Sequence, residues 1–199
     1  FLHECKRRNI TILQDTTHSM FSTDGHHPDA DYYAGSVRKW FGIASGGVAV
    51  KKQGSFSIQP LRADEEHLKG RYKAMEYRKL AIKTGKDSYN ELASSVFWET
   101  EMRLRRMFDA FESDEKSITI LNNLDPTQMI EKRRANYQTV LDSLHPSSQC
   151  QPIFQSLDEN TCPSHFSFYS ENRAKARQQL EQKGITSTVY WPLPPMLTN

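Results

Sequence analysis

The residue with the most distinctive chemistry is Lys39, which lies in the segment Gly35-Ser36-Val37-Arg38-Lys39-Trp40-Phe41-Gly42. Trp40 and Phe41 follow it directly, and Arg38 precedes it. Aromatic neighbours and a nearby cation both disfavour a charged ammonium group, so they favour the neutral amine that attacks carbonyl carbon. The pattern predicts a lysine that can form a Schiff base. The alternative is an ordinary solvated surface charge.

Three other polar residues are placed to assist such a lysine. Ser36 precedes Lys39 by three residues, so one turn would bring its hydroxyl and backbone N–H beside a phosphate group. Asp15 and His18 form an Asp-x-x-His pair directly after an apolar run. This pair predicts either a ligand-binding strand end or, more simply, a turn cap.

The elements that must position these residues are three short strands. The β-branched run Ile10–Leu13 predicts a buried strand that ends near Asp15, and residues 31–35 and 47–52 predict two more. Between the first two strands, residues 19–28 have the composition of a loop. Ligands of α/β sheets bind at the carboxyl ends of strands, so the first fifty residues are expected to frame one site.

The remainder of the chain predicts helices and then a second small α/β layer. Apolar residues three or four apart predict two helices between residues 64 and 111, separated near Gly85, and a third that begins at Pro126. The other expected elements are an extended segment at 117–121, strands at 165–169 and 186–191, and a helix over 172–183 that stops at Gly184.

Composition narrows the function classes. The 199 residues carry a net charge of only +2, which predicts neither a dedicated nucleic-acid binder nor an anionic-membrane binder. No apolar run approaches the roughly 20 residues that cross a bilayer, and no signal peptide is recognisable. We therefore expect a cytoplasmic protein with no membrane and no nucleic-acid partner.

Cysteine and histidine usage favours neither disulfides nor a metal site. Cys5, Cys150 and Cys162 are odd in number and lack zinc-site spacing, which predicts reduced thiols. The histidine and aspartate residues at positions 24–31 lack the helical spacing of a metal site, so we expect a flexible loop and no metal.

Taken together, these segments resemble the DegT/DnrJ/EryC1/StrS (sugar aminotransferase) family of fold type I enzymes, which depend on pyridoxal 5'-phosphate. Lys39 follows Asp15 by 24 residues, as this family would have it. The resemblance covers nearly the whole chain, through the segments 13–19, 31–43, 46–50, 133–137 and 184–192.

The resemblance implies a role for each candidate residue. Lys39 would hold the cofactor as its Schiff-base lysine and would then shuttle a proton during amino transfer. Asp15 would meet the pyridine nitrogen, His18 would lie near the 3′ oxygen, and Ser36 would bond the phosphate. The reaction would move an amino group from an amino-acid donor to a keto acceptor, such as a keto sugar, in a homodimer.

The implied fold is α/β, the C-terminal part of a fold type I transferase. Residues 1–61 would be a partial large domain with the Schiff-base lysine, residues 62–112 a helical connection, and residues 113–199 the small domain. Family members are nearly twice this length, and their N-terminal half carries the phosphate-binding turn and a ring-stacking aromatic residue. Two alternatives stay open: another fold type I enzyme, such as a cysteine-desulfurase-like protein, or a truncated non-catalytic homologue.

Overall fold

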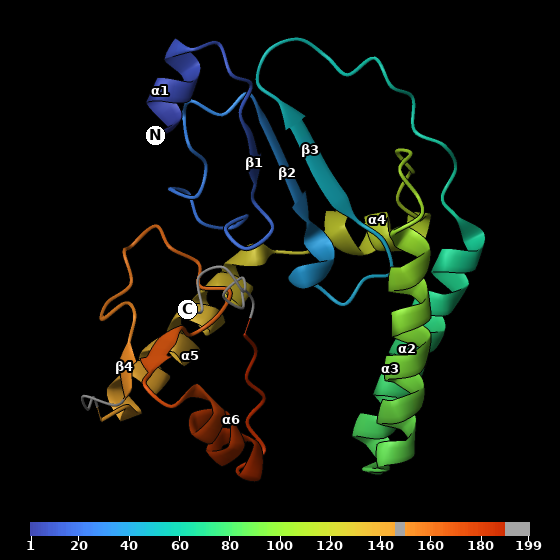
Figure 1. Ribbon diagram of the computed structural model, residues 1–199. Coiled ribbons are helices and arrows are strands. Elements are labelled where there is room, and N and C mark those ends of the chain that lie inside the picture. Colours follow the sequence, from blue (N-terminus) through green and yellow to red (C-terminus); the bar gives the residue numbers. More distant parts are fainter. Residues whose placement is uncertain (146–149, 190–199) are drawn as a thin grey trace, which may run out of the picture. The chain divides into compact units, whose positions relative to one another are not determined.

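The protein has a mixed α/β structure in a computed structural model that describes residues 1–145 and 150–189 (Figure 1). The chain divides into two compact units. Unit 1 contains residues 1–133 and 159–164, and unit 2 contains residues 134–158 and those from 165 onward. The predicted fold class is therefore confirmed as far as α/β.

Unit 1 is built on a three-stranded sheet in the order β1-β2-β3, formed by Leu13–Asp15, Tyr32–Ser36 and Gly47–Lys51. Strands β1 and β2 are parallel, with Leu13 opposite Tyr32 and Asp15 opposite Ala34, and β3 is antiparallel to β2. The first strand begins later than expected. Ile12 is buried, but it contacts Asp31 and Tyr32 through backbone hydrogen bonds outside the ladder.

Several buried residues of unit 1 lie in the segment that follows β2. Val37, Trp40, Ile43 and Ala44 are each at most 7% exposed. Residues Val37–Lys39 form a single turn of 3-10 helix, η1. The lysine segment is thus part of the core of unit 1, and burial of its apolar side chains fixes its path.

Two long helices follow the sheet, as predicted. They are α2 (Glu65–Thr84) and α3 (Asp87–Leu104), which lie side by side in Figure 1. Gly85 ends α2 with a φ of 67°, a left-handed conformation that glycine adopts without strain. A bridge between Leu61 and Phe111 joins the two segments that flank this hairpin.

The prediction of an extended segment at 117–121 is wrong, because Glu115–Asn122 forms helix α4. The β-branched residues there favour a strand by propensity. The Asp114 carboxylate favours the helix instead, because it caps the first turn by accepting the Ser117 N–H at 3.1 Å.

Helix α5 (Pro126–Ser143) begins at the predicted proline and runs from unit 1 into unit 2. The other elements are α1 (Leu2–Arg7) in unit 1 and, in unit 2, the antiparallel strands β4 (Cys150–Pro152) and β5 (Phe168–Ser170) and helix α6 (Arg173–Gln182).

Unit 2 confirms the last predicted helix and only part of the strands. The strand expected at 165–169 is restricted to Phe168–Ser170. Residues 186–189 form no strand, so that prediction is wrong for them, and residues 190 and 191 lie outside the described residues. The domain boundaries expected near Leu61 and Glu112 stay predictions.

Candidate functional site

The two segments that carry the candidate residues are joined by hydrogen bonds. The Thr16 N–H donates to the Ala34 carbonyl oxygen at 2.7 Å, directly beyond the paired residues Asp15 and Ala34. The Ser36 N–H donates to Thr17 Oγ1 at 3.0 Å. The segment after β1 is therefore fixed against the end of β2, at the carboxyl edge of two parallel strands, where ligands of such sheets bind.

Gly35 makes this close approach possible. A Cβ atom at this position would lie 2.9 Å from Thr16 Oγ1 and 2.7 Å from Met20 Cε. Any side chain here would push the two segments apart.

Asp15 is exposed, and its Oδ1 accepts the Thr17 N–H at 2.8 Å. Hydrogen bonds from the Thr17 side chain and backbone lower the pKa of Asp15, and the charge of nearby His18 lowers it further. Asp15 therefore forms the turn cap that its sequence allows. It also presents an ionised carboxylate, with His18 close enough to influence it.

Ser36 is half-buried at the end of β2. Its Oγ is inaccessible to solvent and has no hydrogen-bond partner within the described residues. Buried hydroxyl groups normally have a partner, because leaving one unpaired costs about 1 to 3 kcal/mol. The Ser36 hydroxyl is thus a polar group to which the described residues supply no hydrogen bond.

Lys39 is exposed. Trp40, by contrast, is buried: its indole N–H donates to the Thr17 carbonyl at 2.6 Å, and its ring packs on Phe21 and below the Arg133 guanidinium. Phe41 also packs on Phe21. The shielding of Lys39 by its aromatic neighbours that we expected is not found in the described part of the chain.

Arg38 lies near an acidic residue of helix α3. Its Nη1 is 3.6 Å from Glu101 Oε1, and the side chain keeps 18% of its exposure. Arg38 and Glu101 therefore form an ion pair.

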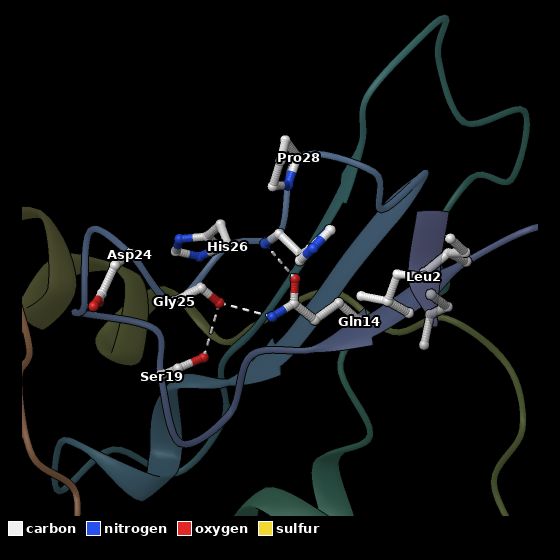
Figure 2. A pocket seen from close by; sticks show the side chains of 10 residues that line it. Leu2, Gln14, Ser19, Asp24, Gly25, His26 and Pro28 are labelled. Atoms are coloured by element: carbon white, nitrogen blue, oxygen red, sulfur yellow. Dashed lines mark hydrogen bonds between the residues drawn. The ribbon is translucent and has the colours of Figure 1, made fainter. Parts of the chain in front are cut away.

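A residue that the sequence analysis missed, Gln14, organises the loop between β1 and β2 (Figure 2). Its Nε2 donates to the Gly25 carbonyl at 2.7 Å, and its Oε1 accepts the His27 N–H at 2.8 Å. The Ser19 hydroxyl also donates to Gly25. Nothing in the sequence distinguishes this glutamine from any other polar residue of a strand.

The same loop borders a cavity of about 470 Å³, which Ile12, Leu13 and Gln14 line from the β1 segment. Asp24 and residues 25–28 line it from the loop. No group of three His, Cys, Asp or Glu side chains that could hold a metal ion occurs in residues 1–145 and 150–189. Histidines 26 and 27 therefore border an open cavity without being part of such a cluster.

No protein-family model, curated protein or solved structure matches this chain. Within the described ranges, no helix combines the length and the apolar character that a bilayer crossing requires. The functional assignment therefore depends on the residues and their geometry.

Proposed function

We propose that this chain is the lysine-bearing part of a fold type I aminotransferase that uses pyridoxal 5'-phosphate, similar to the DegT/DnrJ/EryC1/StrS family. The reaction moves an amino group from an amino-acid donor to a keto acceptor, and the parent enzyme is a cytoplasmic homodimer. The observation that supports this most is the hydrogen bonding of the Thr16–Thr17 segment to the end of β2. It brings the Asp15–His18 segment beside the segment of Ser36 and Lys39.

The residues present fit this cofactor in two respects. The buried Ser36 Oγ lacks a partner in the described residues, and a phosphate oxygen would supply one after a change of the Ser36 rotamer exposes this hydroxyl. The ionised carboxylate of Asp15 is the group that keeps a pyridine nitrogen protonated. When bound, pyridoxal phosphate supplies an electron sink for the negative charge that forms at the donor Cα.

Lys39 has the two remaining tasks. Its exposed Nζ is reachable by an aldehyde, so it can hold the cofactor covalently. The same Nζ would serve as the base that takes the proton from the donor Cα and delivers it to the cofactor. The buried Trp40 and its hydrogen bond to Thr17 fix the backbone on which Lys39 sits.

A cofactor titration tests the proposal. We expect pyridoxal phosphate to produce a saturable visible absorbance band with the wild-type chain, and expect Lys39→Arg to abolish it. Lys52→Arg, which changes another exposed lysine, should retain the band. A saturable band that survives in Lys39→Arg, or its absence from the wild type, would overturn the proposal. Absence of the absorbance band from the wild-type chain would favour the alternative of a non-catalytic homologue.

The desulfurase alternative needs an accessible cysteine. Cys162 is only 2% exposed, and its backbone N–H and carbonyl both contact the Ser22 hydroxyl. Cys5 in helix α1 and Cys150 in strand β4 are half-buried. No observation on the described cysteines favours a sulfur-accepting thiol over the aminotransferase.

A further inference from the structure

Four charged or titratable side chains gather where the lysine segment meets the helical hairpin. They are Arg38 of η1, His67 and Arg71 of α2, and Glu101 of α3. His67 and Arg71 are 7% and 8% exposed, which is unusual for such polar residues. The side chains of Arg38 and Glu101 keep 18% and 29% of their exposure, so the cluster reaches solvent.

Arg38 and Arg71 both lie close to the same carboxylate oxygen, Oε1 of Glu101. Arg71 Nη1 donates to Glu101 Oε1 at 3.1 Å, whereas Arg38 Nη1 lies 3.6 Å from that oxygen, beyond hydrogen-bonding distance. The Arg71 guanidinium also lies over the Phe97 ring, 4.4 Å from its centroid. One carboxylate thus faces two guanidinium groups, which remain charged at any physiological pH.

The cluster is therefore short of negative charge and of hydrogen-bond acceptors. Arg38 Nη1, Arg71 Nε and His67 Nδ1 are buried atoms without a hydrogen-bond partner in the described residues. Burial lowers the pKa of His67, and the charges of Arg38 and Arg71 lower it further, so this imidazole is neutral at neutral pH. A buried cation without a matching anion is costly, so a bound anion would stabilise this arrangement.

We propose that Arg38 and Arg71, which lie beside the neutral His67, form a binding site for one small oxyanion, a carboxylate or a phosphate. Guanidinium groups present several N–H donors in one plane, which suits the oxygens of both anions. Glu101 holds Arg71 in place and occupies part of the site, so it competes with the ligand. The site shares no residue with the proposed cofactor contacts of Asp15 and Ser36, and the inference does not depend on them.

Calorimetric titration of the cofactor-free chain with sodium acetate or sodium phosphate, at constant ionic strength set with chloride, tests the inference. We expect saturable binding of at least one of the two anions. Acetate alone would identify a carboxylate site, and phosphate alone would identify a phosphate site. Binding of neither anion would overturn the proposal.

Variants assign the binding to the cluster. Arg71→Gln should weaken it at least 10-fold, whereas Arg78→Gln, which changes an exposed arginine of the same helix, should leave it unchanged. Glu101→Gln should tighten it several-fold, because the competing charge is removed. If Arg71→Gln does not fold, the anion affinity of Glu101→Gln still tests the proposal. Unchanged or weaker binding in Glu101→Gln, or full binding in a folded Arg71→Gln, would refute the site.

Discussion

Replacement of Asp114 by asparagine should destabilise unit 1, because this carboxylate joins three segments. It caps α4 through the Ser117 N–H, accepts the Ser45 hydroxyl at 2.6 Å, and accepts the hydroxyl of Tyr72 on α2. The Asp114 N–H returns a hydrogen bond to Ser45 Oγ at 2.8 Å. Asparagine keeps the shape of the side chain and removes its charge.

The magnitude follows from the pKa of Asp114. Burial alone would raise this pKa, but the hydrogen bonds from Ser117, Ser45 and Tyr72 outweigh burial and hold it at about 2. The difference from an ordinary aspartate corresponds to about 2.5 kcal/mol of stability. The carboxylate is partly exposed, and solvent screening reduces this to about 1 to 2 kcal/mol.

The assay is urea unfolding of the wild type and Asp114→Asn at pH 7 and at successively lower pH. A depressed aspartate pKa contributes stability above about pH 4, and this contribution is lost as the pH falls toward 2. The difference between the two proteins should therefore shrink over that range. Asp125→Asn is the control, since Asp125 is exposed and accepts hydrogen bonds from the side chain and the backbone N–H of the nearby Thr127. Equal stability of the wild type and Asp114→Asn at pH 7, or a difference that does not shrink as the pH falls from 4 toward 2, would refute the reasoning.

Two further predictions concern the contact between α2 and α3. A Cβ at Gly70 would lie 2.5 Å from Thr100 Cγ2, and this overpacking costs roughly 1 to 3 kcal/mol. Alanine recovers roughly 1 kcal/mol through its better helix propensity, so Gly70→Ala should lower the free energy of unfolding by about 1 kcal/mol. The double variant Gly70→Ala/Thr100→Ser lacks that methyl group and should regain the loss in urea unfolding; a double variant that is no more stable than the single one would contradict this. The lowered pKa of His67 means that the unfolded chain binds a proton below about pH 6.5 while the folded chain still does not. Stability should therefore fall as the pH drops from 7 to 5, and this fall should be weaker in His67→Gln; identical pH profiles of the two proteins would show that His67 is not the cause.

Local patterns predicted most of the elements that frame the candidate site. The three strands of unit 1 lie near short apolar, aromatic or β-branched runs between turn residues, and the helical hairpin follows from apolar spacing and Gly85. Helix α4 was missed because its β-branched residues favour a strand. The cap that overrides them, the Asp114 carboxylate bound to the Ser117 N–H, is a local signal that the sequence analysis did not use. Only the additional hydrogen bonds from Ser45 and Tyr72 to Asp114 come from residues distant in the sequence.

The environment of the candidate residues was harder to predict than their identity. Trp40 follows Lys39 in the chain but packs on Phe21 and Arg133, and these partners cannot be read from the lysine segment. The same is true of Arg38, whose partner Glu101 lies on a helix more than sixty residues later. The approach of the Asp15 and Ser36 segments was predictable, because both segments follow strands that pair in parallel.

The most direct measurement of the central claim is the position at which pyridoxal phosphate becomes attached. The chain is treated with a substoichiometric amount of the cofactor, reduced with borohydride, digested, and mapped by mass spectrometry. We predict that the label is concentrated on the peptide that contains Lys39, and that Asp15→Asn reduces this label without affecting exposed lysines such as Lys52. A label spread evenly over the exposed lysines, with Lys39 not preferred, would contradict the account.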